Sequence, residues 1–313
     1  MAEKRCYTVK ELQEILTQDS TNLQARRQLA ALLLDNDYNE EALKQFLYLA
    51  NIYPDNPDSY YNLGIAYEKT KNFKLAKSAY EQAIAKNPDD ADYYYNLGMV
   101  CLETEDYDDA IENFSVVLAS DENDSNTYFN LGVCFFNTEN YTEALENFSK
   151  TVELNPQDYY AHFYLGNIFK EIGQLELAMQ EFQAVVAIRP DYSWAYFNMA
   201  SIYFDIQDYG SAIQNLILTI QHNPNDIKAC ELLVKLFVQY EQMYTCIAFL
   251  EGLIGQNEFN YDYYYLLAQV YKQMGDMEQY CANLNIMLEN EDKITYSVKM
   301  IQRELKRYEQ SGD

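Results

Sequence analysis

The sequence is poor in the two residues that most often interrupt helices. It has 10 glycines and 6 prolines among 313 residues. Both are unfavourable inside helices, so their scarcity excludes a collagen-like chain and favours long, regular helices. Hydrophobic residues make up 49% of the chain, which is enough to bury a core and excludes a disordered chain.

Positive charge is also scarce. The chain has 22 Lys and Arg residues against 49 Asp and Glu residues, for a formal net charge of −27. A field of this sign repels DNA, RNA and anionic lipids, so we expect neither nucleic acid nor a membrane as a partner. The charge favours a basic partner, or it serves only to keep the protein soluble, and the composition leaves both open.

No apolar run approaches the roughly 18 residues that span a bilayer. The first residues, Met1 to Tyr7, carry no apolar signal core, so we expect a cytoplasmic protein. The cysteines are scattered without a C-x-x-C pair, as expected of small buried side chains in a reducing compartment. They are Cys6, Cys101, Cys134, Cys230, Cys246 and Cys281.

Side chains suited to chemistry are few. The only histidines are His162 and His222, and no catalytic triad order, phosphate-binding loop or H-E-x-x-H motif occurs. The spacing Asp106-x-Asp108 with Glu112 lacks the loop glycine and the twelve-residue span of a calcium loop. We therefore predict that the protein is not an enzyme and has no cofactor and no metal site.

The chain does contain an internal repeat. The string Tyr61-Asn62-Leu63-Gly64 returns 34 residues later as Tyr95-Asn96-Leu97-Gly98, and again as Phe129-Asn130-Leu131-Gly132. Related strings continue at the same spacing from Phe163 and from Phe197. A period of this length, unbroken by insertions, predicts a stack of similar units that share one continuous core.

Within each unit the apolar spacing is helical. In the second unit Tyr60, Leu63 and Tyr67 lie on one face of a first helix, and Ala76 and Tyr80 lie on one face of a second helix. A proline then closes most units. The frame predicts eight units at 23–56, 57–90, 91–124, 125–158, 159–192, 193–226, 227–260 and 261–294. Residues 1–22 and 295–313 are predicted to form N-terminal and C-terminal capping helices.

The period and the residue types resemble the tetratricopeptide repeat. A small residue of the second helix recurs as Ala42, Ala76, Ala110, Ala144, Ala178 and Ala212, and we expect Ala110 and Ala144 to be buried where two helices touch. The resemblance implies an all-α fold, a right-handed superhelical solenoid of antiparallel helix pairs whose first helices line a concave groove. Cys246 and Tyr280 replace the small alanine in the last two units, so we expect those two helix pairs to be less regular.

The groove that the resemblance implies would be lined by an apolar set and an amide set of side chains. The apolar set is Tyr61, Tyr95, Met99, Phe129, Phe136, Phe163, Trp194, Phe197 and Phe204. The amide set is Asn62, Asn96, Asn130, Asn167 and Asn198. The rings either bind a ligand or pack between repeats, and binding is favoured for Trp194, Phe136 and Phe204. The amides pair either with the backbone of an extended ligand or within the array.

We expect a non-catalytic scaffold or adaptor that binds a peptide or helix of a partner protein in this groove. The alternatives are a structural subunit that grips a folded partner or itself, and a targeting arm for a separate enzyme. A cationic clamp for acidic tails is not expected, because Tyr61, Ile65, Asn96 and Asn130 stand at its places. Unit 91–124 has ten acids and no Lys or Arg, so the partner is expected to be basic unless the acids only form a solvated edge. The oligomeric state is left open.

Overall fold

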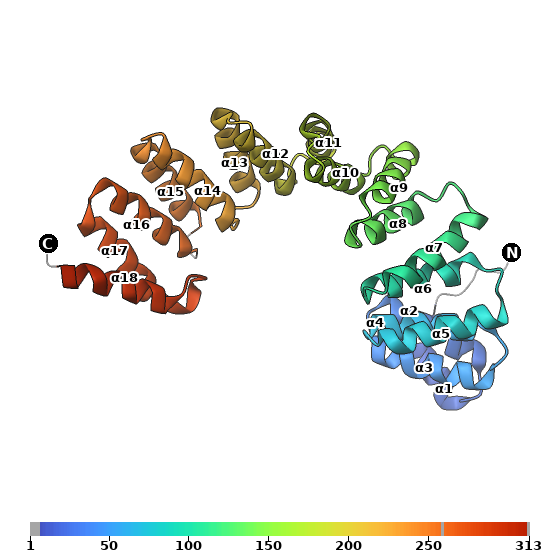
Figure 1. The fold of residues 1–313 in the computed structure, drawn as a ribbon. Coiled ribbons are helices and arrows are strands. Elements are labelled where there is room, and N and C mark those ends of the chain that lie inside the picture. The colour runs from blue at the N-terminus through green and yellow to red at the C-terminus, as the bar shows by residue number, and fades with distance from the viewer. Residues whose placement is uncertain (1–6, 258–259, 312–313) are drawn as a thin grey trace. The chain divides into compact units, whose positions relative to one another are not determined.

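The computed structural model describes residues 7–257 and 260–311. These residues form 18 α-helices and one short 3₁₀ helix, and they contain no strand (Figure 1). The predicted all-α fold of consecutive helix pairs is confirmed. Cys6 lies outside the described residues, as do the ends of both predicted terminal segments.

The helices follow the period of the sequence. The first helices of the pairs are α2 (Leu23–Asp35), α4 (Pro57–Lys69), α6 (Ala91–Glu103), α8 (Ser125–Asn137), α10 (Tyr159–Glu171), α12 (Ser193–Asp205), α14 (Ile227–Gln239) and α16 (Asp262–Met274). The second helices are α3 (Asn39–Ile52), α5 (Phe73–Lys86), α7 (Tyr107–Ser120), α9 (Tyr141–Leu154), α11 (Leu175–Ile188), α13 (Tyr209–His222), α15 (Met243–Gln256) and α17 (Met277–Leu288). At the two ends lie α1 (Val9–Gln18), the 3₁₀ helix η1 (Glu291–Lys293) and α18 (Val298–Ser311). The division into eight units with two caps remains our proposal.

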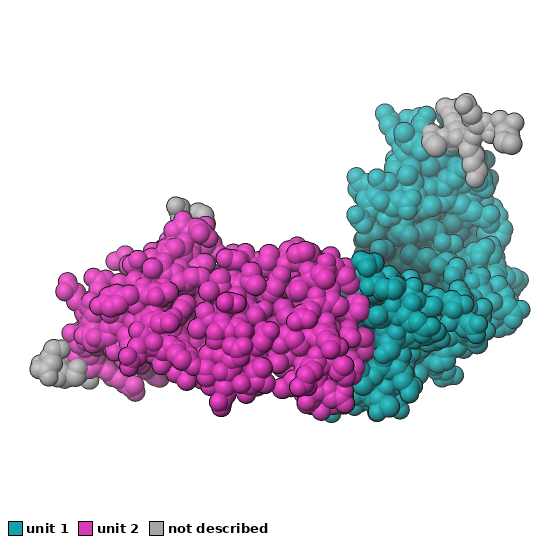
Figure 2. Space-filling model, turned by 90° about the horizontal axis from the view of Figure 1, so that it is seen from above, with its two compact units in different colours: residues 1–161 teal, residues 162–313 magenta. Residues whose placement is uncertain are grey.

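The chain folds as two compact units, residues 1–161 and 162–313 (Figure 2). Each unit has its own buried clusters, for example around Ala110 and Phe114 in the first and around Leu233 and Leu250 in the second. No helix among the described residues is long and apolar enough to span a bilayer.

A tight turn joins the two helices of each pair. The residue after the C-cap of the first helix, or the C-cap residue Gly275 itself in the last pair, is left-handed, with φ between 57° and 82°. The N–H of the next residue donates to a carbonyl five residues back, as from Asp106 to Cys101 at 2.8 Å. This 6→1 bond closes the helix end and is typical of a Schellman motif. The left-handed residues are Asp37, Lys71, Glu105, Glu139, Gly173, Gln207, Glu241 and Gly275.

The two helices of a pair approach most closely where a glycine of the first meets a ring of the second. A Cβ added to Gly98 would stand 2.7 Å from Cε1 of Phe114, and one added to Gly64 would stand 2.5 Å from Cε1 of Tyr80. Gly132 with Phe148 and Gly166 with Phe182 repeat the contact. Each ring fills the space that a side chain on the glycine would take, and all four rings are fully buried.

In helix pairs without this glycine, the residue that faces its position from the second helix is different. Ala200 packs in one core with Leu216, and Val234 does so with Leu250. A larger residue on the first helix is therefore matched by a smaller one on the second. Ala30 with Phe46 departs from this rule, and Phe46 has room because it lines a cavity.

The alanines of the second helices occupy the predicted packing positions. All six, from Ala42 to Ala212, have no exposed surface. Cys246 and Tyr280, at the same place in the last two pairs, are buried as well, with 0% and 2% exposed.

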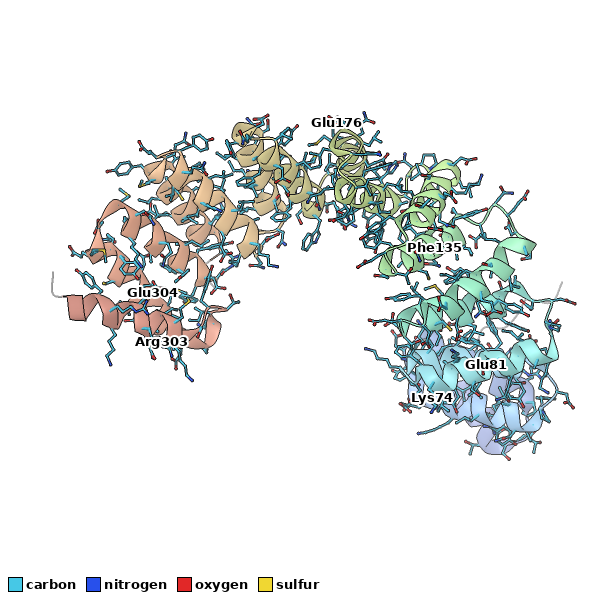
Figure 3. All side chains as sticks on the ribbon, in the orientation of Figure 1. Lys74, Glu81, Phe135, Glu176, Arg303 and Glu304 are labelled. Carbon is cyan, nitrogen blue, oxygen red and sulfur yellow. The ribbon has the colours of Figure 1, made fainter. Side chains whose placement is uncertain are left out.

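Tyr280 fits in place of an alanine because its hydroxyl has a specific partner on α18. The hydroxyl donates to Oε2 of Glu304 at 2.5 Å, and Tyr265 and Gln269 donate to the same carboxylate. Glu304 faces the preceding helices, whereas its neighbour Arg303 is exposed (Figure 3). Burial raises the pKa of Glu304, but the hydrogen bonds outweigh it, so the pKa lies below its usual value. A charged carboxylate thus fastens α18 to the last pair.

We predict that Gly98→Ala destabilises the protein by about 1–3 kcal/mol, because the new methyl group overlaps the Phe114 ring. Gly252→Ala on α15 is the matched control. Nothing lies within 4 Å of its added Cβ, so this change should stabilise the helix by about 0.5–1 kcal/mol. Urea unfolding measures both, and equal stability of the two variants would contradict the packing argument. Phe114→Leu added to Gly98→Ala should recover part of the loss.

We predict that Tyr280→Phe loosens α18, because Glu304 then loses its shortest hydrogen bond while staying partly buried. The expected cost is about 1–3 kcal/mol. Hydrogen exchange of the α18 amides should accelerate while exchange in α4 to α9 stays unchanged. Tyr265→Phe, which removes a 3.1 Å bond to the same carboxylate, should have a smaller effect.

Candidate partner-binding face

The predicted binding residues all lie on first helices. Tyr61, Tyr95, Met99, Phe129 and Phe136 lie on α4, α6 and α8 of the first unit, with Asn62, Asn96 and Asn130. Phe163, Asn167, Trp194, Phe197, Asn198 and Phe204 lie on α10 and α12 of the second unit. Each group is therefore described within its own unit.

In the pairs from α6 to α11 the ring at the fifth position of the first helix packs against a ring of the second helix. Tyr95 lies against Phe114 with ring centroids 5.9 Å apart, and Phe129 lies against Phe148 at 5.6 Å. Phe163 contacts Phe182 at 5.9 Å in the same way. These rings cover the ring that meets the glycine, so they complete the core of the helix pair.

The amides of the first unit are bonded within the array. Nδ2 of Asn96 donates to the hydroxyl of Tyr61 at 3.1 Å, and Nδ2 of Asn130 donates to the hydroxyl of Tyr95 at 3.2 Å. Each bond joins one repeat to the next. Nδ2 of Asn62 donates to the carbonyl of Asp58 in its own helix. Both donors of Asn96 and of Asn130 are thus occupied, whereas Asn62 keeps one N–H, and the amide oxygens are also left for a ligand.

Trp194 on α12 differs from the other aromatic residues of the row. Its side chain is 53% exposed, and its ring meets only the edge of Phe197, with centroids 6.4 Å apart. Phe136 and Phe204 are half-buried, against Tyr141 at 5.9 Å and Tyr209 at 5.6 Å. Packing within the fold therefore buries more of the Phe136 and Phe204 side chains than of the Trp194 side chain.

Two amides and a lysine lie on the same unit as Trp194. Oδ1 of Asn198 accepts from Nζ of Lys170 at 3.1 Å, and its Nδ2 donates to the carbonyl of Trp194. The side chain of Asn167, three residues before Lys170 on α10, has no hydrogen bond to another described residue. This face combines one exposed apolar ring with side chains that can both donate and accept.

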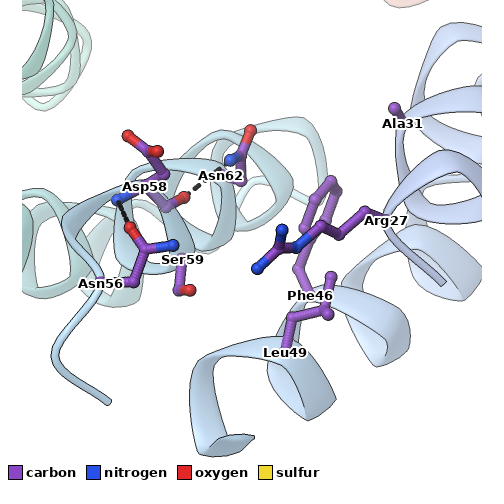
Figure 4. A pocket seen from close by; sticks show the side chains of 8 residues that line it. All are labelled: Arg27, Ala31, Phe46, Leu49, Asn56, Asp58, Ser59 and Asn62. Atoms are coloured by element: carbon purple, nitrogen blue, oxygen red, sulfur yellow. Dashed lines mark hydrogen bonds between the residues drawn. The ribbon is translucent and has the colours of Figure 1, made fainter. Parts of the chain in front are cut away.

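The sequence interpretation missed a cavity in the first unit that is lined by one cation, Arg27, and one carboxylate, Asp58. A cavity of about 240 Å³ lies between α2, α3 and α4, lined by Arg27, Phe46, Asn62 and neighbouring residues (Figure 4). Arg27 stands where later repeats carry Tyr61 and Tyr95, and its guanidinium lies 4.7 Å from the centre of the Tyr53 ring. Arg27, a cation at a position that is aromatic in the following repeats, was the sequence signal that could have indicated this cavity.

The groups available for chemistry are held in structural contacts. Nδ1 of His162 lies 2.6 Å from Oε2 of Glu181. Burial raises the pKa of Cys101 to about 11 and that of Cys134 to about 12, so both thiols are protonated at neutral pH. Among the described residues no cluster of three or more His, Cys, Asp or Glu side chains could hold a metal ion.

The acidic segment of α6 and α7 is partly neutralised by the preceding pair. Nζ of Lys77 lies 2.6 Å from Asp109 and 3.6 Å from Asp106. Asp108 and Glu112 are exposed, and no ion pair between described side chains involves either residue. Part of the negative charge of this segment therefore stays available to a partner.

We predict that Asn130→Ala costs about 1 kcal/mol of stability, because Asn130 is 8% exposed and bonds the preceding repeat. A double-mutant cycle with Tyr95→Phe tests the bond itself. The two changes should be non-additive by about 0.5–1 kcal/mol in chemical unfolding. Additive losses would mean that the amide and the hydroxyl act independently.

Comparison with solved structures shows the same fold at low sequence identity. YrrB, described as "a TPR protein with an unusual peptide-binding site", is 24% identical, with a TM-score of 0.51 over 59% of this chain and 95% of its own. Pseudomonas aeruginosa PilF is 18% identical, with a TM-score of 0.57 over 68% and 97%. The APC/C hetero-tetramer Cut9–Hcn1 is 16% identical, with a TM-score of 0.51 over 84% of this chain and 52% of that chain. A comparison with curated proteins gives no match.

Models of one family match several parts of the chain. Tetratricopeptide repeat models match residues 61–125, 125–158, 147–180 and 261–284, and a further TPR repeat model matches residues 166–207. These matches agree with the 34-residue period, the interlocked helix pairs and the fold of the solved structures. The chain therefore belongs to the tetratricopeptide repeat family.

Proposed function

We propose that this protein is a non-catalytic scaffold that binds a peptide or helix of a partner protein on the first-helix face of its repeats. Proteins of the tetratricopeptide repeat family mediate protein–protein interactions, and the fold is typically non-catalytic. The observation that carries the proposal is the 53% exposure of Trp194 on α12. An exposed Trp on a rigid helix is typical of residues that dominate binding energies.

The surroundings of Trp194 suit an extended or helical segment with an apolar anchor. The exposed ring offers the contact area, and Asn198 on the same helix and Lys170 on α10 offer polar groups near it. Asn167 adds an amide with a free donor and a free acceptor, which can pair with one peptide unit of a ligand. The solved YrrB structure, with its peptide-binding site, is a precedent for this mode within the same fold.

The second candidate is a structural subunit that grips a folded partner. The Cut9–Hcn1 hetero-tetramer, whose fold covers 84% of this chain, is the precedent for it. The cytoplasmic location, the absence of a cofactor and a basic partner remain predictions. The exposed acids Asp108 and Glu112 support the last of these.

Trp194 is the only tryptophan, so its fluorescence reports directly on this face. We predict that peptides selected from a random display library against the whole chain will shift its emission on binding. Trp194→Ala should weaken these peptides by about 2 kcal/mol, roughly thirtyfold, with little change in melting temperature. Tyr244→Ala, which removes a ring that is 79% exposed on α15, should leave the affinity unchanged.

The opposite pattern would count against the proposal. If the selected peptides leave the emission unchanged and bind the Trp194→Ala variant normally, the binding surface lies elsewhere. If no peptide is selected and only folded proteins bind, the structural subunit is the better description.

A further inference from the structure

The C-cap position of the first helix is polar in the first unit. Thr70, Thr104 and Thr138 hold it, and each hydroxyl donates at 3.0 Å to the carbonyl four residues back. Each of these carbonyls also accepts the backbone N–H of the same threonine, so the hydroxyl adds a second hydrogen bond at the helix end. A polar side chain at this position therefore has a clear structural use.

The same position is apolar and exposed in the first three pairs of the second unit, whereas Gly275 holds it after α16. Ile172, Ile206 and Tyr240 hold it, with 43%, 54% and 43% of their surface exposed. The cap itself is unchanged, because the backbone N–H of Ile206 donates to the carbonyl of Ile202 at 3.1 Å, as that of Thr138 does to Cys134. The turn does not need these apolar side chains, and exposing them to water is unfavourable. Their presence indicates a surface that a partner covers.

A cleft lies beside two of these turns. The rings of Tyr209 and Tyr240 are in contact, with centroids 5.5 Å apart, and together with Ile213 they line a cavity of about 380 Å³. Gln207, Asp208 and Gln242 form its rim. The cleft lies wholly within the second unit, between the α12–α13 turn and the α14–α15 turn, and can accept an apolar side chain.

The charges within the three turn segments are all of one sign. The turn segments 171–177, 205–211 and 239–245 contain five acids and no Lys, Arg or His. The acids are Glu171, Glu176, Asp205, Asp208 and Glu241, and all five are exposed, as Figure 3 shows for Glu176. A partner that covers the apolar side chains must therefore approach through a negative field, which favours Lys and Arg at its margins.

We propose that the turn edge formed by Ile172, Ile206 and Tyr240 is a second binding surface, which takes a basic amphipathic helix of a partner protein. The apolar stripe of that helix lies over Ile206 and the Tyr209–Tyr240 cleft. Its flanking cations face Asp205, Asp208 and Glu241. This surface lies on the turns and is distinct from the Trp194 face, so either can exist without the other.

The test uses the full chain and a labelled synthetic peptide of about fourteen residues, roughly four turns, in which leucine and lysine form an amphipathic helix. Fluorescence anisotropy gives its affinity. Two further peptides separate the contributions: one replaces lysine with glutamate, and the other replaces leucine with serine. We expect the leucine–lysine peptide to bind at least tenfold more tightly than either.

The variants restore the residue that the first unit carries at this position. Ile206→Thr with Tyr240→Thr should weaken the leucine–lysine peptide at least tenfold, and Ile206→Thr alone should weaken it about threefold. Because threonine caps the same turn in the first unit, both variants should fold, which circular dichroism checks. Val116→Thr, at a residue 38% exposed on α7, removes an apolar side chain outside the edge and should leave the affinity unchanged.

Three results would overturn the proposal. One is that both threonine variants bind the leucine–lysine peptide with an affinity within twofold of that of the wild-type chain. Another is loss of that binding in Trp194→Ala, which would place the peptide on the other face and leave the turn edge without a ligand. The third is a dimer of the unliganded chain that sedimentation detects and that Ile206→Thr with Tyr240→Thr dissolves, since the edge would then serve self-association.

Discussion

The structure depends on how closely two helices of a pair can approach each other. At Gly64, Gly98, Gly132 and Gly166 the backbone of the first helix lies directly against a ring of the second. That ring is covered in turn by the ring at the fifth position of the first helix. A short inter-helix distance and a buried aromatic ring are thus one feature, which accounts for part of the high tyrosine and phenylalanine content of the chain.

The polar contacts add specificity to this apolar stack. Hydroxyls of Tyr61 and Tyr95 extend past the core and bond Asn96 and Asn130 of the next repeat. At the other end of the chain Tyr280 holds Glu304 of α18. In each case a tyrosine supplies apolar area inside one repeat and a hydrogen bond to the following element. Neighbouring elements are therefore held together by hydrogen bonds as well as by packing.

The sequence predicted the helices because the period and the apolar spacing are local properties. It also predicted that Ala110 and Ala144 are buried, since a small residue at a fixed place in each repeat has a packing reason. It could not distinguish bound amides from free ones, because the bond from Asn130 to Tyr95 joins residues 35 positions apart. Nor could it show why Tyr280 is tolerated, because the reason is the carboxylate of Glu304 on another helix.

The turns have a consequence for how this chain can change. Their left-handed residues are mostly not glycine, since Lys71, Glu105 and Gln207 adopt φ near 60°. Main-chain hydrogen bonds hold the geometry, so the side chains there face few structural constraints. Substitutions at the turns can accumulate through neutral drift while the core residues stay fixed. Each repeat can therefore acquire its own surface chemistry at the turns, and a new partner can be gained there without the fold being altered.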